Sequence, residues 1–259
     1  SEAFGVERLS KIYRQAESSH IVLNAHKINA GELITLDNKN KDFFFFEKKD
    51  VRSVMGALVY LVKTRLPEYI GASPFEIQVL TPMRKGELGV EHLNEVLQYY
   101  LNPASESKKE KEGRTGVFRE GDKVMQVKNN YKLEWKITNA KGFSIEEGLG
   151  VFNGDMGIIK QINTYSERIT VVFDENREAE YPFSSLDELE LAYAITIHKS
   201  QGSEYPAVVL PLLSGPPILC NRNLLYTAIT RAQKCVAIAG RQSMVEQMIH
   251  NETEQKRYS

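Results

Sequence analysis

Hydrophobic residues follow two different patterns along the chain, and the first of them predicts a parallel sheet. Residues 43–46 are four consecutive phenylalanines between charged flanks, which is typical of a buried strand. Apolar residues then recur at helical spacing over 51–62, after the candidate N-cap Asp50, and Pro67 is expected to end this helix. Residues 75–83 predict another buried strand. The strand–helix–strand order implies a crossover connection and therefore a parallel sheet.

The segments around these elements are less regular. A short helix is predicted to end near residues 13–19, and residues 20–29 then mix an apolar run with polar groups. A second amphipathic helix is predicted over about 88–101. Residues 102–116 are polar and charged, which predicts a linker or mobile loop. Its lysines fit either a solvated surface or a binding patch.

The pattern changes to short alternating segments between about 118 and 184. Gly, Asn and Asp turns separate these segments, which indicates a small antiparallel barrel or sandwich. Longer apolar strands of the parallel type then return at 191–197, 207–213 and 235–240. Further helices are predicted around 222–232 and 241–250. The predicted fold class is therefore α/β, a parallel-sheet domain interrupted by a small inserted β-barrel.

Composition narrows the function classes only a little. The 259 residues are 42% hydrophobic and 26% charged, as in ordinary globular proteins, and the net charge of −1 gives no global indication of nucleic-acid binding. Cys220 and Cys235 have no CxxC spacing, which argues against a zinc site and against a disulfide scaffold. No apolar run reaches the length of a membrane span. We therefore expect a reduced, cytoplasmic protein without a metal site of its own.

Residues 192–205 (AYAITIHKSQGSEY) pass from an apolar run directly into a dense group of hydrogen-bonding side chains. Such an assortment is typical of a site that binds phosphate, ribose or backbone. Residues 221–234 predict a helix with Leu225, Ala228, Ile229 and Ala232 on its buried side and Arg231 on the other. A solvated arginine is the plain alternative for Arg231. Beside a donor-rich strand end, however, its guanidinium fits the neutralisation of a transferring phosphate.

Arg14 is a second arginine of this kind, although a helix-terminal arginine is commonly only a surface or dipole partner. The phosphate-binding pattern GxxxxGK[ST] is absent from the sequence. No apolar strand ends in a carboxylate pair suited to Mg²⁺, and turns explain the glycines of 148–157. The sequence thus offers arginines for a γ-phosphate but nothing to hold the rest of a nucleotide.

This combination resembles the C-terminal half of a superfamily-1 DNA helicase, and within that group the RecD-like branch with 5′→3′ polarity. The resemblance covers nearly the whole chain: residues 12–29 resemble motif IV, 79–98 the segment after it, 121–159 the Src-homology-3-like barrel, 194–205 motif V and 225–232 motif VI. It implies a second RecA-like motor domain made of residues 1–117 and 187–259, with the barrel inserted at 118–186.

The resemblance also implies roles for individual residues. Arg14 and Arg231 are the expected catalytic residues, at the γ-phosphate and as the arginine finger. The nucleotide is expected to contact Gln15, Gly202 and Glu204, with Glu204 at the ribose. The expected single-strand DNA contacts are Thr81, Pro82, Met83, Thr196, His198 and Lys199. The alternatives are a capping or core-edge role for His198 and a plain turn at Thr81 and Pro82.

The implied cofactors are ATP and Mg²⁺, held chiefly by a first motor domain that this sequence does not contain. The implied partners are that domain and single-stranded DNA or duplex junctions, with further repair proteins, in DNA repair or recombination. The abrupt start favours a fragment, which we expect to be inactive as an ATPase alone. In the barrel, Trp135, Tyr131 and Lys132 are candidate stacking and phosphate groups, unless Trp135 packs the barrel.

Two other functions are compatible with these residues. One is a non-enzymatic nucleic-acid-binding or adaptor module, in which the barrel binds and the α/β part is a scaffold. The other is the helicase portion of a conjugative relaxase, which shares the motor motifs.

Overall fold

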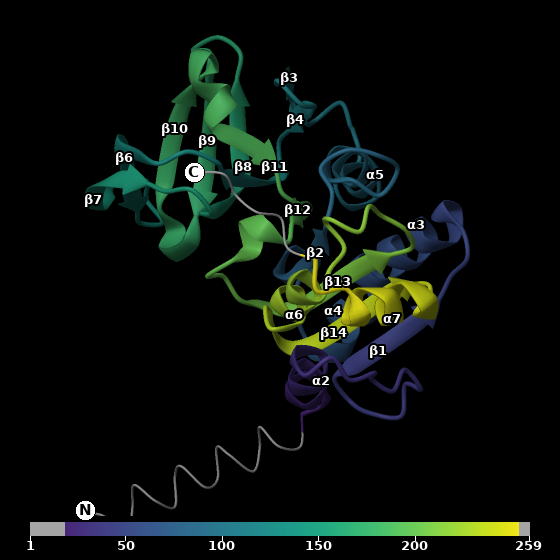
Figure 1. Cartoon of the computed structure of the whole chain (residues 1–259). Helices are drawn as coiled ribbons and strands as arrows, with labels where there is room; N and C mark the ends of the chain where they lie inside the picture. Colours follow the sequence, from purple (N-terminus) through teal and green to yellow (C-terminus); the bar gives the residue numbers. More distant parts are fainter. Residues whose placement is uncertain (1–18, 254–259) are drawn as a thin grey trace, which may run out of the picture. The chain divides into compact units, whose positions relative to one another are not determined.

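The computed structural model describes residues 19–253, and the chain divides into two compact units. Within the described residues, unit 1 comprises 19–89 and 195–253, and unit 2 comprises 90–194. The helix predicted before residue 19, together with Arg14 and Gln15, lies outside the described residues. Each unit is built around its own sheet (Figure 1).

Unit 1 contains the predicted parallel sheet. Its strands lie in the order β1 (Phe43–Glu47), β14 (Ala232–Gly240), β13 (Tyr205–Leu212), β2 (Ile77–Thr81) and β12 (Ala194–Thr196). The pairs β1–β14, β14–β13 and β13–β2 are all parallel. All five residues of β2 are buried, as expected for a strand with both faces of the sheet covered. The α/β class with a parallel sheet and an inserted β unit is therefore confirmed.

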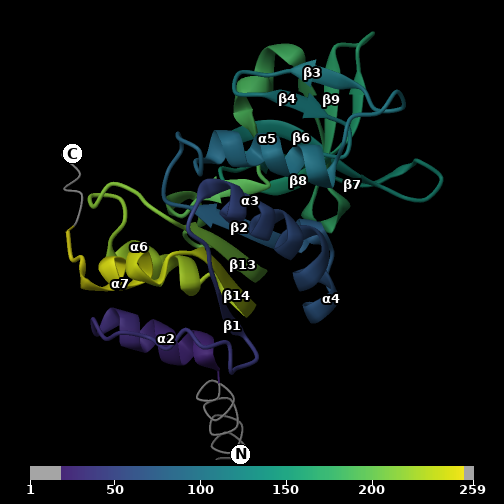
Figure 2. The ribbon, with the colours of Figure 1, turned by 90° about the vertical axis from the view of Figure 1, so that its right-hand side faces the viewer.

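Helices cover both faces of this sheet (Figure 2). α3 (Val51–Tyr60) and α4 (Leu66–Ile70) lie on one face, and α6 (Arg222–Ile229), α7 (Gln242–His250) and α2 (His20–Asn29) lie on the other. The sequence pattern did not identify α2. Its signals are Ser19, whose hydroxyl accepts from the Val22 amide (3.4 Å), and buried residues at helical spacing: Ile21, Asn24, Ala25 and Ile28.

The prediction that Pro67 ends the helix is wrong. A π-helical turn at Leu61–Arg65 joins α3 to α4, and Pro67 lies in the first turn of α4, where the missing N–H is tolerated. The helical run therefore continues to Ile70 and ends at Gly71, whose φ of 66° is left-handed.

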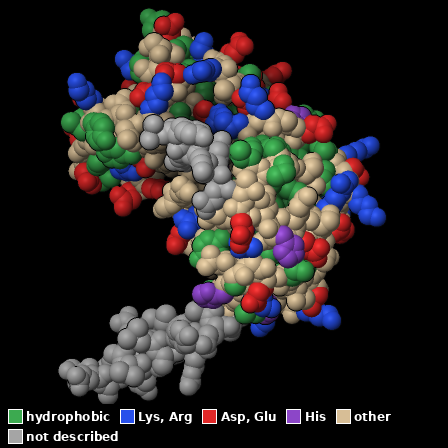
Figure 3. Space-filling view, in the orientation of Figure 1, with side chains coloured by type: hydrophobic (Ala, Val, Ile, Leu, Met, Phe, Trp, Pro, Cys, Tyr) green, Lys and Arg blue, Asp and Glu red, His purple; other side chains and the backbone are tan. Residues whose placement is uncertain are grey.

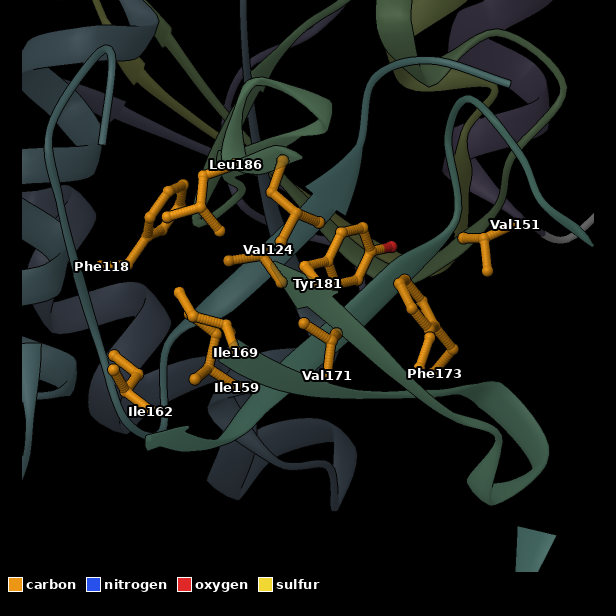
Figure 4. Packing of buried hydrophobic residues seen from close by; sticks show 12 residues of the cluster. Phe118, Val124, Val151, Ile159, Ile162, Ile169, Val171, Phe173, Tyr181 and Leu186 are labelled. Atoms are coloured by element: carbon orange, nitrogen blue, oxygen red, sulfur yellow. The ribbon is translucent and has the colours of Figure 1, made fainter. Parts of the chain in front are cut away.

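Unit 2 is the predicted antiparallel β unit. Its strands lie in the order β11 (Leu189–Leu191), β5 (Lys123–Gln126), β8 (Met156–Asn163), β9 (Arg168–Phe173), β10 (Glu178–Pro182), β6 (Asn130–Thr138) and β7 (Ser144–Val151). The burial of β9 alternates along the strand, so that Ile169, Val171 and Phe173 point into one core (Figure 4). The predicted helix near 88–101 is α5 (Val90–Leu101), and it belongs to this unit.

Two further expectations need correction. Residues 102–116 are not wholly a loop, because β3 (Glu110–Glu112) pairs with β4 (Val117–Arg119). The apolar run 191–197 is not one parallel strand, because it divides at residues 192–193. β11 joins the antiparallel sheet and β12 joins the parallel one, so a single apolar run serves both sheets.

Both cysteines are buried thiols without a disulfide partner, and burial raises the pKa of Cys235 to about 12. Among residues 19–253, no helix combines the length and the apolar character needed to cross a bilayer.

A buried carboxylate fastens α5 to the sheet of unit 2. Asp122 has no exposed surface and accepts hydrogen bonds from Gln98 (2.7 Å), Asn102 (2.8 Å), the Tyr193 hydroxyl (2.7 Å) and the Arg119 amide (2.7 Å). Burial raises the pKa of Asp122, and these donors oppose the shift. Each donor would lose its partner if the carboxylate were removed, so the network holds unit 2 together.

We predict that Asp122→Asn destabilises the protein by about 2–3 kcal/mol, because the new amide turns an N–H₂ group towards donors that need an acceptor. Urea unfolding followed by circular dichroism measures the loss. Asp174→Asn, at an exposed position, is the matched control and should stay within about 0.5 kcal/mol of the native protein. Equal effects of the two substitutions would contradict a central role for the Asp122 network.

Candidate nucleotide and DNA contact sites on unit 1

The loop after β12 begins with a tightly fixed turn. The Thr196 hydroxyl accepts a hydrogen bond from the Lys199 amide (3.2 Å), and the fully buried Ser200 donates to the Ile197 carbonyl (2.6 Å). These bonds leave the His198 side chain exposed and that of Lys199 half-buried. The structure therefore presents His198 at the surface, not as a core-edge residue.

The second half of the loop has an open backbone. Gly202 has a φ of 82°, and no atom lies within 4 Å of the position that a Cβ would take. Glu204 is exposed and accepts a hydrogen bond from the Gln233 side chain (3.2 Å). A ligand can approach the Gly202 backbone closely, which suits a phosphate or ribose contact.

Arg231 does not lie on a helix, in contrast to the sequence prediction. α6 ends at Ile229, Thr230 caps it, and β14 begins at Ala232. The guanidinium donates to the Thr227 carbonyl (3.2 Å), the Ser203 carbonyl (3.3 Å) and the Thr230 hydroxyl (3.4 Å). The bond to Ser203 brings Arg231 onto the loop that carries Gly202 and Glu204.

The charge of Arg231 has no counter-ion there. All three hydrogen-bond partners are neutral, and within residues 19–253 no carboxylate lies within ion-pair distance of its guanidinium. The neighbouring Tyr205 hydroxyl has a raised pKa because it is buried, although its hydrogen bond with Ser203 and the positive charge of Arg231 oppose the shift. A half-buried, oriented and unpaired guanidinium is suited to an anionic ligand.

The predicted DNA contacts gather elsewhere. The Thr81 carbonyl accepts a hydrogen bond from the Ile197 amide (3.0 Å), which brings the end of β2 beside the Thr196–Lys199 turn. The Thr81 side chain is fully buried and donates to the Leu88 carbonyl (2.7 Å). Pro82 is buried and Met83 half-buried. Thr81 thus shapes the strand end, whereas Met83, His198 and Lys199 have accessible surface.

The sheet register separates these two groups of residues. Val79 pairs with Val209, so Thr81 lies level with Pro211 on β13. Tyr205 pairs with Ala232 at the other end of the same strand, next to Glu204 and Arg231. Six residues of strand amount to roughly 20 Å. The candidate nucleotide contacts and the candidate DNA contacts therefore lie at opposite ends of the strands, which form two edges of the sheet. Residues 197–204 join them.

The sequence did not indicate the residues that position Arg231 and Glu204. Ser203 contributes a main-chain carbonyl to Arg231, and Gln233 is an ordinary exposed residue in the sequence. Neither position carries a chemical signal. Only the hydrogen bond in the folded chain shows that the Gln233 side chain lies beside Glu204.

Two family models and several known proteins match parts of this chain. The family described as the ATP-dependent RecD-like DNA helicase SH3 domain matches residues 93–173, and the UvrD-like helicase C-terminal domain matches residues 191–239. The ATP-dependent RecD2 DNA helicase of Deinococcus radiodurans is 34% identical over 233 residues, 90% of this chain. The RecBCD enzyme subunit RecD of Mycolicibacterium smegmatis is 29% identical over 68% of the chain.

The chain spans only 28% and 27% of the lengths of these two relatives. A solved structure of the Pif1 helicase from Bacteroides in complex with ADP-AlF3 and single-stranded DNA is 18% identical, with a TM-score of 0.48. That superposition covers 89% of this chain and 51% of the Pif1 chain.

We predict opposite effects of one substitution at two exposed glycines. Gly202→Ala should destabilise the protein by about 1 kcal/mol, because an L-residue is strained at this φ although the space is open. Gly56→Ala, in α3 and also with open space, should stabilise it by about 0.5–1 kcal/mol. Urea unfolding of both variants measures the difference. The same sign for both would show that the turn at Gly202 does not require its left-handed conformation.

Proposed function

The chain belongs to the RecD-like helicases, and we propose that it forms the second motor domain of an ATP-dependent DNA helicase, with Arg231 as its arginine finger. The observation that carries this proposal is the oriented, unpaired guanidinium of Arg231 on the Ser203–Tyr205 segment. A guanidinium in this state is available to phosphate charge that develops during hydrolysis.

The residues at this edge fit one side of ATP but not its magnesium ion. Arg231 would contact the γ-phosphate, and the open Gly202 backbone and Glu204 would approach the rest of the nucleotide. Glu204 is a single carboxylate, and no group of three or more metal-ligating side chains occurs among residues 19–253. Mg²⁺ and most of the nucleotide would therefore be held by a first motor domain, which this sequence does not contain.

The opposite edge would contact single-stranded DNA. Met83, His198 and Lys199 offer accessible groups there, and Thr81 and Thr196 fix the backbone around them. Residues 197–204 connect this edge to Arg231 through eight residues of continuous chain. Motion of this segment would couple the state of the bound nucleotide to the affinity for the DNA strand. A motor that steps along DNA requires such coupling.

The resemblance to the RecD-like helicases is the support for the remaining residue roles, domain bounds and partners. Arg14 and Gln15 would complete the nucleotide contacts, and residues 118–186 would be the inserted barrel between motor segments 1–117 and 187–259. The whole protein would unwind DNA 5′→3′ in repair or recombination, in the cytoplasm. Its partners would be duplex junctions and other repair proteins.

A non-enzymatic adaptor is the rival of a different class. It would use unit 2 for binding and would have no need of a free guanidinium at the edge of the parallel sheet. The helicase portion of a conjugative relaxase shares the motor site, and only an upstream nicking domain would distinguish it.

We predict that Arg231→Ala lowers DNA-stimulated ATP turnover of the complete helicase by about 10³–10⁵-fold, the usual effect of removing an arginine finger. Arg231→Lys should recover little of it, because an ammonium lacks the planar fork of donors. The measurement is steady-state phosphate release with saturating single-stranded DNA.

The matched control is Lys234→Ala, which removes an exposed cation three residues away on β14 and should leave turnover unchanged. Unaltered turnover in Arg231→Ala would refute the arginine-finger assignment and favour the adaptor.

A further inference from the structure

Unit 2 is acidic although the whole chain is almost neutral. Residues 90–194 contain 19 Asp and Glu against 13 Lys and Arg, a net charge of −6. The rest of the chain contains 15 acidic and 20 basic residues, a net charge of +5. An acidic surface repels phosphate and attracts cationic groups. The charge that favours nucleic acid therefore lies in unit 1, and unit 2 has the charge of a surface for basic partners.

A groove opens in unit 2 where two strands part. β10 and β6 pair at only two positions, Glu178–Lys136 and Ala179–Trp135. Beyond them the ladder ends, and a groove of about 740 Å³ lies between the strands, lined by Glu180 and Pro182 on β10 and by Leu133 and Glu134 on β6. Unpaired strand edges that flank a groove suit an extended peptide, which can add main-chain hydrogen bonds.

The lining of this groove combines acidic and apolar side chains. Five glutamates line it against three basic residues: Glu134, Glu147, Glu178, Glu180 and Glu188 against Lys132, Lys136 and Arg168. Glu178 is paired with Lys160, and Glu188 accepts from Asn130. Glu134 and Glu180 form no ion pair with any residue of the described range. These two carboxylates are therefore available to a cationic ligand.

Apolar surface lies beside these carboxylates. The Trp135 indole covers Gly148 on β7, where a Cβ would lie 2.3 Å from the ring, and the Arg177 guanidinium lies 5.5 Å from its centre. Leu149 is 63% exposed on the same hairpin, and Phe143 and Ile145 are exposed towards its tip. In Figure 3, hydrophobic side chains gather where β6 and β7 lie, with acidic side chains next to them. Trp135 thus anchors the hairpin and also lines the groove.

We propose that the groove between β10 and β6 binds an extended, basic segment of a protein partner. Lys or Arg side chains of the segment would pair with Glu134 and Glu180, and an intervening apolar side chain, which points to the other face, would pack against Trp135. Charge complementarity selects this occupant over a nucleic acid strand, whose phosphates Glu134 and Glu180 would repel. The inference is independent of the motor function proposed for unit 1.

The chain contains a single tryptophan, Trp135, so its fluorescence reports directly on the groove. The probe is a synthetic peptide of alternating Lys and Leu, with a Glu–Leu peptide of equal length as its control. The Lys–Leu peptide should change the Trp135 emission saturably, and the affinity should fall with added salt. No saturable change, or an equal response to the Glu–Leu peptide, would overturn the proposal.

Charge reversal tests the two carboxylates. The double variant E134K/E180K should weaken binding of the Lys–Leu peptide by about tenfold or more. The matched control E91K/E106K makes the same charge change at exposed positions outside the groove and should leave the affinity within about twofold. Equal weakening of both variants would indicate only a general charge effect. Displacement of the peptide by an oligothymidylate would show instead that the groove binds nucleic acid. Either result would contradict the proposal.

Discussion

The register of β13 within the parallel sheet is the constraint on which the candidate site depends. At one end of this strand, the Tyr205–Ala232 pair places the loop residues Gly202–Glu204 beside Arg231. Towards the other end, the Val79–Val209 pair places Thr81 and the turn after β12 at the far edge. A shift of a single residue would turn every side chain of the strand to the other face and would separate Arg231 from its loop. Two sites roughly 20 Å apart are therefore held by one buried strand.

The two units stabilise themselves in different ways. Unit 1 buries nearly continuous apolar strands, as parallel sheets do when helices cover both faces. Unit 2 combines an alternating apolar core with the buried carboxylate of Asp122, which binds α5 to the sheet. The units also carry opposite net charge, which separates a surface suited to phosphate from one suited to cationic segments.

Much of the fold was predictable because the hydrophobic pattern reports burial directly. The strand at 43–46, the strand within 75–83 and the antiparallel segments after 118 follow from it. The errors arose where local geometry overrides propensity. A π-turn carries the helix past Pro67, and one apolar run divides between two sheets around Tyr193. The position of Arg231 after α6 was also hidden, because the continuous buried run of the next strand, β14, begins only at Cys235. Contacts through main-chain carbonyls, such as that of Ser203 with Arg231, cannot be predicted from residue types, because every residue has this group.

As proposed above, this chain would supply one side of an ATP site, and a second domain would complete it. The most direct test is Mg·ATP hydrolysis by the purified 259-residue chain, with and without single-stranded DNA. We expect no turnover in either condition, because Arg231 and its loop would contact only one face of the nucleotide. Turnover stimulated by DNA would contradict it, since the chain would then contain a complete phosphate and magnesium site of its own.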